Sequence, residues 1–236
     1  MDPTILASDM DTVVLMLAAG RGERLGGMTP KAFVPLLGIP LLVRSIRTFL
    51  ALKEVDLIQP VLAEADFALY ESLDLPRDAR LAPPVSGGAL RQDSVAAGLA
   101  AVPEEVEWVV VHDAARCLVT PDDIERVRLA ARAHDAAILA APARDTIKIV
   151  DDGAVAETPD RECCWAAQTP QVFKRELLAR ALEQARREGF VGTDDSQLVE
   201  RLGTPVQIVE GPWQNIKITV PGDLVLAEAI LKEGKP

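Results

Sequence analysis

Two cationic side chains near a glycine-rich segment are the residues whose types and spacing first suggest chemistry. Residues 17–26 read LAAGRGERLG, and Pro30 and Lys31 follow shortly afterwards. Small residues let the phosphates or ribose of a ligand lie against main-chain N–H groups, while Arg24 and Lys31 neutralise phosphate charge. The spacing lacks the Gly-Lys-Ser/Thr of the kinase and ATPase phosphate loop, and it is not a dinucleotide fingerprint. The segment therefore predicts a nucleotide site of another kind.

The prediction of a nucleotide site depends mainly on Lys31. The glycines alone are also compatible with a tight exit from a strand, but Lys31 lies between Pro30 and the apolar stretch 33–35. A solvated surface lysine has little reason to occupy such surroundings, so we expect Lys31 to contact a phosphate group.

Asp113 is the second candidate, because it closes an apolar run. Ligands of open parallel sheets collect at the carboxyl ends of the strands, which favours a site role for Asp113 over helix capping. His112 beside it is interpreted as a packed, hydrogen-bonded histidine. Asp194 and Asp195 are compatible with capping a helix and with contacting substrate, and the sequence leaves both alternatives open.

The elements that must position these residues alternate along the chain. Apolar, β-rich runs predict strands, and periodic stretches opened by proline or a polar residue predict helices. The expected strands are 12–19, 55–63, 108–112 and 136–141, and the expected helices are 40–50, 92–101, 121–133, 174–188 and 221–233. This order predicts an α/β fold with a mostly parallel, Rossmann-like sheet flanked by helices on both faces.

One segment breaks the alternation and predicts a protruding β-hairpin arm. Residues 146–150, the turn Asp151-Asp152-Gly153 and the stretch from Val155 onward have the pattern of a hairpin. Two strands alone are marginal in water, so we expect the arm to pack on a second subunit. The organisation is then a single domain over 1–236 with an inserted dimerisation arm at 144–168. Trp165 and Trp213 are expected to anchor a core or an interface.

Composition narrows the class of protein. The formal charge of −11 argues against a nucleic-acid or anionic membrane surface. The first residues lack the basic start of a secretory signal, and no apolar run is long enough to span a bilayer. Cys117, Cys163 and Cys164 do not have metal-ligand spacing and are interpreted as reduced packing residues. We therefore expect a cytoplasmic protein without a nucleic-acid or membrane partner.

Six blocks in order resemble one family of nucleotidyltransferases. Besides the first segment up to Lys31, these are GGALRQDSV at 87–95, VHDAAR at 111–116, APARDTIK at 141–148, QTPQ at 168–171 and NIKIT at 215–219. Together they resemble the 2-C-methyl-D-erythritol 4-phosphate cytidylyltransferases of non-mevalonate isoprenoid synthesis. The resemblance implies transfer of CMP from CTP to 2-C-methyl-D-erythritol 4-phosphate, with release of pyrophosphate.

The resemblance also implies roles for individual residues. Those matched to CTP contacts are Ala18, Ala19 and Gly20 for ribose and phosphates, and Gly88 and Ser94 for cytosine. Those matched to stabilisation of the transition state are Arg24 and Lys31. Those matched to the polyol phosphate are Asp113 with Arg116 beside it, Thr169 and Lys217, and also Thr146 and Arg161, which would reach the site of the neighbouring subunit in a homodimer.

Elementary chemistry agrees with these roles. A phosphate monoester is already mostly ionised near neutral pH, so its attack on a nucleotide needs neither a general base nor a covalent nucleophile. The reaction instead requires cations, which are supplied by Arg24, Lys31, Arg161 and Lys217. Each positioned cation is expected to stabilise the transition state by about 2–4 kcal/mol. We expect Mg²⁺ to bind mainly through the CTP phosphates, because no protein ligands for it are evident from spacing.

Departures and rivals remain. Ala89 replaces an acidic or polar residue of many relatives, and 193–197 differs from the commoner Thr-Asp-Glu-Ala-Ser. The nearest rival substrate is ribitol 5-phosphate. A regulatory module without turnover is disfavoured because Arg24, Lys31 and Lys217 are all present. A glycosyltransferase is disfavoured because 112–114 is not an Asp-x-Asp pair.

Overall fold

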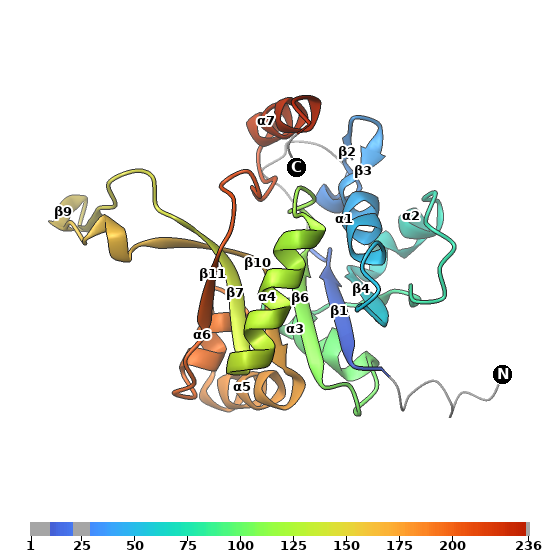
Figure 1. Ribbon diagram of the computed structural model, residues 1–236, viewed down its shortest axis with the longest axis horizontal. Helices are drawn as coiled ribbons and strands as arrows, with labels where there is room; N and C mark the ends of the chain where they lie inside the picture. The colour runs from blue at the N-terminus through green and yellow to red at the C-terminus, as the bar shows by residue number, and fades with distance from the viewer. Residues whose placement is uncertain (1–9, 21–28, 235–236) are drawn as a thin grey trace.

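The expected sheet is present, with one strand reversed. The computed structural model describes residues 10–20 and 29–234, shown in Figure 1. The strands of its main sheet are, in spatial order, β11 (Gln207–Glu210), β7 (Ala136–Pro142), β10 (Trp165–Lys174), β6 (Trp108–Asp113), β1 (Thr12–Leu17), β4 (Leu57–Leu62) and β5 (Val85–Ser86). Only β10 is antiparallel to its neighbours in this sheet, β6 and β7. The prediction of a mostly parallel α/β sheet is therefore confirmed.

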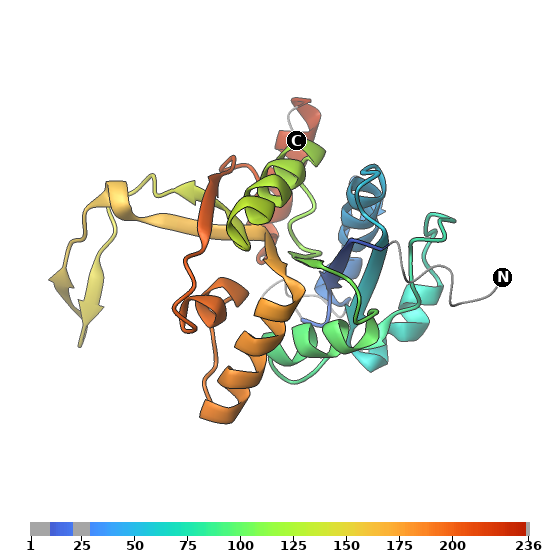
Figure 2. The same cartoon turned by 60° about the horizontal axis from the view of Figure 1, so that its bottom comes forward.

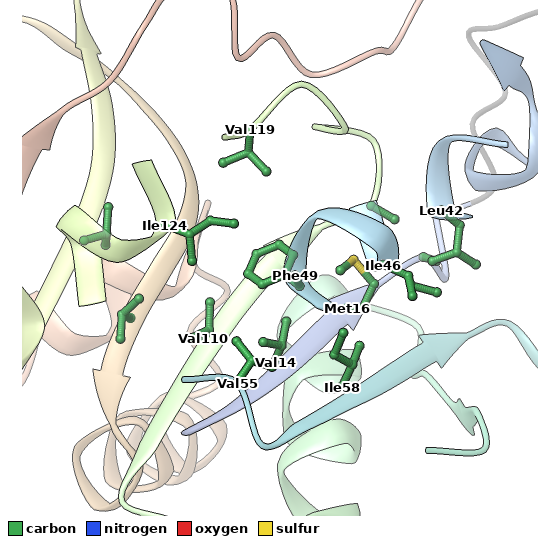
Figure 3. Close-up of a cluster of buried hydrophobic side chains, with 14 of the residues drawn as sticks. Val14, Met16, Leu42, Ile46, Phe49, Val55, Ile58, Val110, Val119 and Ile124 are labelled. Carbon is green, nitrogen blue, oxygen red and sulfur yellow. The ribbon is translucent and has the colours of Figure 1, made fainter. Parts of the chain in front are cut away.

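Helices cover both faces of the sheet because its central strands are apolar on both sides. All six residues of β1 are buried, and alternate residues of a strand point to opposite faces. Val14 and Met16 pack on the side of α1 (Leu41–Leu50) and α4 (Pro121–His134), where Phe49 fills the centre of the cluster in Figure 3. Val13 and Leu15 face the other side. There they meet α3 (Arg91–Ala101), α5 (Arg175–Glu188) and α6 (Asp195–Glu200).

Local capping explains where the helices begin and end. Thr120 Oγ1 accepts a hydrogen bond from Asp123 N at 3.1 Å, and Pro121 occupies the first turn of α4. Asp223 Oδ2 accepts from the backbone N–H groups of Thr219 and Val220 ahead of α7 (Pro221–Lys232). All five expected helices are present, and none of their ends moves by more than one residue.

Several elements, all of them short except β10, were not predicted from the sequence. They are β5, β10, β11, α6, α2 (Phe67–Glu71), and a small hairpin of β2 (Pro35–Leu36) and β3 (Ile39–Pro40). Strand β10 is the one that matters for the sheet. It returns from the arm beside β7, and a chain that leaves and comes back in this way must run antiparallel to the strand it left.

The arm is formed by β8 (Ile149–Asp151) and β9 (Ala154–Glu157). Asp152 and Gly153 at its tip have φ of +46° and +77°, which is the geometry of a two-residue hairpin turn of the primed type. Every residue of both strands is exposed. Figures 1 and 2 show the arm extending well away from the sheet and its helices.

Two expectations about side-chain burial need correction. Cys117 is buried, as expected of a packing residue, but Cys163 is exposed and Cys164 is partly exposed, because both lie on the arm. All three cysteines are free. Trp165 and Trp213 are 36% and 43% exposed, so neither anchors the core of this chain, and a role at an interface stays a prediction.

Arg80 closes the carboxyl end of α1, which gives a stability prediction. Its guanidinium donates to three carbonyl oxygens, those of Leu50 (2.7 Å), Leu52 (2.7 Å) and Val55 (3.2 Å). A lysine cannot reproduce this fork, so we expect Arg80→Lys to lower the free energy of unfolding by about 2 kcal/mol. Urea denaturation measures the change, and Arg77→Lys, at an exposed neighbouring arginine, is the control. Equal stabilities of the two variants would contradict this role.

Candidate active site

A cavity opens at the carboxyl ends of β1 and β6, where the sequence predicted ligand contacts. We name it the glycine cavity; it is lined by Leu17, Ala18, Ala19, Gly20, Lys31, Ala32, Gly88, Ala89, Leu90, Arg91, Ser94, Asp113, Ala114, Ala115 and Lys217. The structure therefore brings together all five residues assigned to the nucleotide, from segments that are distant in sequence. Arg24 lies outside the described residues.

Close backbone packing explains the glycine pair on one wall of this cavity. A Cβ atom at Gly87 would lie 2.7 Å from Ser94 Oγ and 2.9 Å from Ala19 Cβ. A Cβ atom at Gly88 would lie 2.3 Å from Asp93 Cβ. The Gly88 N–H donates to the buried Ser94 hydroxyl at 3.2 Å. Only glycine allows this main chain to approach α3 so closely.

Lys31 also lines the glycine cavity. It begins the short 3₁₀ helix Lys31–Phe33, in which Ala32 and Phe33 are buried and so fix the turn against the core. The charge of Lys31 helps to lower the pKa of Asp223. Burial acts to raise that pKa, but hydrogen bonds from Val220 and Thr219, together with the positive charge of Lys31, outweigh the effect of burial. The apolar neighbours seen in the sequence thus serve to hold Lys31 at the cavity.

A second cavity adjoins the first, and we name it the threonine cavity. It is lined by Arg91, Asp113, Arg116, Ala167, Gln168, Thr169, Gln171, Thr193, Asp194 and Lys217. Arg116 donates from Nη1 to Asn215 O at 2.9 Å and from Nη2 to Ala167 O at 3.1 Å. Its Nε is buried and has no hydrogen-bond partner among the described residues. Four of the residues assigned to the polyol phosphate, Asp113, Arg116, Thr169 and Lys217, therefore share this cavity.

His112 is a fully buried, neutral histidine, as predicted. Burial lowers its pKa to about 3, so it carries no charge at neutral pH. Its Nδ1 lies 3.0 Å from Thr169 Oγ1, which also accepts a hydrogen bond from Asp113 N at 3.1 Å. The imidazole lines neither cavity, and its role is to hold Thr169 in place.

Asp113, Lys217 and Arg91 line both cavities and form the boundary between them. Lys217 Nζ is 2.6 Å from Asp113 Oδ2, and Arg91 Nε is 3.4 Å from Asp113 Oδ1. Burial alone would raise the pKa of Asp113, but the charges of Arg91 and Lys217 outweigh burial and hold that pKa well below its usual range. Asp113 is therefore a carboxylate at any physiological pH.

Sequence reasoning missed Arg91. It stands in the block at 87–95 but received no role, since an arginine at the start of a helix has no pattern that distinguishes a site residue from a surface one. The available signal was its place three residues after the glycine pair, at the first position of α3.

Hydrogen bonds to neighbouring elements fix the segment that carries Lys217. Asn215 Nδ2 donates to Gln168 Oε1 at 2.9 Å and to Thr169 O at 3.0 Å, and the backbone N–H of Ile218 donates to Ala115 O at 2.9 Å. These bonds tie the segment to β10 and to the end of β6. They explain why Asn215 and Ile218 flank the lysine in the sequence.

Thr146 and Arg161 do not join the other site residues within one chain. Both lie on the arm segment and line neither cavity. Arg161 is exposed, and its Nη1 makes a long contact of 3.5 Å to Arg144 O.

The structure separates the two roles that the sequence left open for Asp194 and Asp195. Asp194 caps α6 by accepting from Gln197 N at 3.0 Å, and it also lines the threonine cavity. Asp195 does neither. It is fully buried, and its Oδ2 accepts a hydrogen bond from Arg91 Nη1 at 2.6 Å.

The arrangement suits the meeting of two anions. Two cavities share a wall that carries fixed cations, and positive charge on both sides reduces the mutual repulsion of two phosphate-bearing ligands. Among residues 10–20 and 29–234, no group of three or more His, Cys, Asp or Glu is placed to hold a metal ion. No helix in the same ranges is long and apolar enough to cross a membrane.

Comparisons with known proteins identify what this chain is similar to. A family model described as 2-C-methyl-D-erythritol 4-phosphate cytidylyltransferase matches residues 12–233. The protein of that name from Symbiobacterium thermophilum is 48% identical over 93% of this chain and 92% of its own length. The one from Geobacter metallireducens is 42% identical over 96% of this chain and 100% of its own.

Solved structures agree with the sequence relatives. The 4-diphosphocytidyl-2C-methyl-D-erythritol synthase of Anaerococcus prevotii superposes with a TM-score of 0.85 at 30% identity, over 97% of this chain and 99% of that one. The 2-C-methyl-D-erythritol 4-phosphate cytidylyltransferase of Thermus thermophilus gives 0.77 at 35% identity, over 94% and 100%.

Proposed function

Because the chain belongs to the 2-C-methyl-D-erythritol 4-phosphate cytidylyltransferase family, we propose that its two adjoining cavities bind the two substrates of that reaction. The chain is a cytidylyltransferase that transfers CMP from CTP to 2-C-methyl-D-erythritol 4-phosphate. The products are 4-diphosphocytidyl-2-C-methyl-D-erythritol and pyrophosphate, in isoprenoid synthesis. Ribitol 5-phosphate is not favoured as the acceptor, since the relatives above are named for methylerythritol phosphate.

The observation that carries the assignment of substrates to cavities is the shared wall of Asp113 and Lys217. CTP occupies the glycine cavity, with ribose and phosphates against Ala18–Gly20 and cytosine near Gly88 and Ser94. These placements are supported by the small residues and exposed main chain of that cavity. The triphosphate then runs toward Lys31.

The polyol phosphate occupies the threonine cavity. The Asp113 carboxylate accepts hydrogen bonds from polyol hydroxyls, and Thr169 and Arg116 supply further contacts. An oxygen of the polyol phosphate attacks the α-phosphorus of CTP in line with the departing pyrophosphate. One P–O bond forms and one breaks, and no proton has to be removed first because the phosphate is already ionised.

Lys217 lies where the two substrates meet. In the free protein its ammonium is paired with Asp113 at 2.6 Å, which fixes its direction before either substrate arrives. We assign Lys217 the role of orienting the attacking phosphate and Lys31 that of stabilising charge on the triphosphate. Arg24 is assigned the same role as Lys31 from its place in the sequence.

Mg²⁺ is proposed to bind through the triphosphate oxygens. Asp113 is the only carboxylate that lines the glycine cavity in the described part of the chain, and Lys217 and Arg91 contact its two oxygens. A bound ion would neutralise charge on the triphosphate and so ease the departure of pyrophosphate.

The arm is proposed to form a cytoplasmic homodimer in which each active site is shared. Val150 and Val155 of the hairpin are 59% and 60% exposed, and Ile147 and Ile149 nearby are also exposed. A two-stranded ribbon with such a surface needs apolar cover, which a second copy supplies. Thr146 and Arg161 would then reach the threonine cavity of the partner. The three free cysteines suit a reducing compartment.

The test of the reaction is pyrophosphate release with each nucleoside triphosphate, crossed with methylerythritol 4-phosphate, ribitol 5-phosphate and a hexose phosphate. We expect turnover only with CTP and methylerythritol 4-phosphate, because the glycine cavity reads the base and the threonine cavity reads the polyol. Turnover with UTP and the hexose phosphate would instead indicate a sugar-activating enzyme.

A further inference from the structure

Four side chains of alternating charge follow one another from the protein interior to the wall between the cavities. Asp195 pairs with Arg91, Arg91 contacts Asp113, and Asp113 pairs with Lys217. The separations along this line are 2.6, 3.4 and 2.6 Å. The mechanism above uses Asp113 and Lys217, but it leaves Asp195 without a role.

Asp195 cannot touch either substrate. It is fully buried and lines neither the glycine cavity nor the threonine cavity. Gln171 of β10 fixes the start of α6, because Gln171 Oε1 accepts from the backbone N–H groups of Asp195 and Ser196, each at 3.2 Å. The backbone that carries this carboxylate is therefore fixed, and its one side-chain hydrogen bond to a residue of the cavity walls is the one to Arg91.

The burial of this carboxylate is costly. Oδ1 of Asp195 has no hydrogen-bond partner among the described residues, so Arg91 is its main compensation. Burial raises the pKa of Asp195, and the attraction of Arg91 offsets only part of that effect. An apolar residue here would avoid the cost, which indicates that the negative charge serves the site rather than the core.

The distances show what the charge does to Arg91. Nη1 of Arg91 is at 2.6 Å from Asp195, and only Nε faces Asp113, at the long distance of 3.4 Å. An arginine prefers to bind one carboxylate through two parallel hydrogen bonds. By holding Nη1, Asp195 excludes the end-on pairing of Nη1 and Nη2 with Asp113, and it leaves the Nε edge of Arg91 at 3.4 Å from Asp113, too far for a close bidentate pair.

We propose that Asp195 is a positioning residue, which holds Arg91 back so that Asp113 remains available to Lys217 and to the hydroxyl groups of the polyol. The proposal rests on the proposed function, since it assumes that Asp113 accepts from the acceptor substrate. Without the Asp195 charge, Arg91 turns onto Asp113 and competes with both of these partners.

Steady-state kinetics of Asp195→Asn test the proposal, since asparagine keeps the shape and removes the charge. We expect KM for methylerythritol phosphate to rise about tenfold, the scale of one lost charge-assisted hydrogen bond, while the Kd for CTP by calorimetry changes less than about twofold. A general loosening of the fold would instead weaken the binding of both substrates. An unchanged KM for the polyol phosphate overturns the proposal.

The double variant Asp195→Asn/Arg91→Gln gives the sharper result. With Arg91 gone, nothing competes for Asp113, and we expect KM for the polyol phosphate to return to within about threefold of the parent value. A double variant impaired at least as much as Asp195→Asn overturns the route through Arg91. This variant also avoids an unpaired buried charge, which Arg91→Gln alone would leave and which could prevent folding.

Asp123→Asn is the matched control. Asp123 is another buried carboxylate in the first turn of a helix, paired with Arg126 at 2.5 Å, and it lines neither cavity. We expect this variant to keep the parental KM values even if its melting temperature falls. A change in KM equal to that of Asp195→Asn would identify a nonspecific effect and overturn the proposal.

A crystal structure of Asp195→Asn separates this inference from the proposed reaction. We expect two nitrogens of Arg91 on Asp113 and a longer Lys217–Asp113 distance, whatever the enzyme turns over. Arg91 unmoved in that structure overturns the inference even if the reaction is confirmed. Conversely, absence of turnover by the parent protein contradicts the reaction and leaves the geometric test intact.

Discussion

The Lys31→Ala variant should remain folded and lose about a hundredfold in kcat, the usual effect of removing one fixed charge donor from a water-poor site. Lys31 lines the glycine cavity on a 3₁₀ turn whose next two residues are buried. The buried residues anchor the turn, so the backbone that carries the Lys31 ammonium is fixed at the cavity before a ligand binds. Negative charge shifts onto the departing pyrophosphate as the P–O bond breaks. A cation that is already in place stabilises that charge without reorganisation, and water in the space left by alanine does not.

Single-turnover and steady-state measurements separate this effect from weaker binding. We expect kcat to fall far more than the Kd for CTP rises, because the interaction strengthens in the transition state. Lys53→Ala, at an exposed lysine outside both cavities, should leave kcat unchanged. Since the Lys31 charge also acts on Asp223 near the start of α7, a small decrease in melting temperature is acceptable. A parental kcat would remove Lys31 from the mechanism.

Mixing two inactive proteins should restore activity, if the arm completes the partner's site. An Arg161→Ala subunit retains the glycine cavity and an Lys31→Ala subunit retains the arm, so the mixed dimer contains one intact site and one doubly damaged site. With random exchange, about a quarter of the parental activity should return, because half of the dimers are mixed and each has one working site. The exposed position of Arg161, away from both cavities of its own chain, motivates this test.

The control for subunit mixing uses the same exchange with a different partner. An Lys31→Ala/Arg161→Ala subunit mixed with Lys31→Ala cannot assemble an intact site and should remain inactive. Native mass spectrometry verifies that mixed dimers are present. No recovery in verified mixed dimers would show that Arg161 does not act across the interface, and a monomeric mass would contradict the proposed role of the arm.

Charge placement in this site follows from the cost of burial. Asp113 and Asp195 are both buried, and each is paired with a cation that comes from a different part of the chain. A buried carboxylate without such a partner would shift its pKa and lose its charge. The site therefore requires that the sheet, α3, α6 and the segment of Lys217 assemble together. Only in that assembly do the individual cations compensate the buried carboxylates.

The sequence by itself determined the local structure. Apolar runs predicted the four longest parallel strands, capping residues predicted where helices begin, and Asp152-Gly153 predicted the turn of the arm. The glycine-rich segment and its lysine also predicted a phosphate-binding site without help from the fold. These features depend on residues within a few positions of one another, so their backbone preferences and spacing can be recognised directly in the sequence.

Only the tertiary structure decided which charges meet. Asp195 and Arg91 are 104 residues apart, and no local pattern indicates that they pair. The reversal of β10, the division of Asp194 and Asp195 into a cap and an internal ion pair, and the meeting of Asp113 with Lys217 were likewise hidden from the sequence. The physical reason is that Coulomb attraction depends on distance through space and on burial, and both are set by strand order rather than by neighbours along the chain.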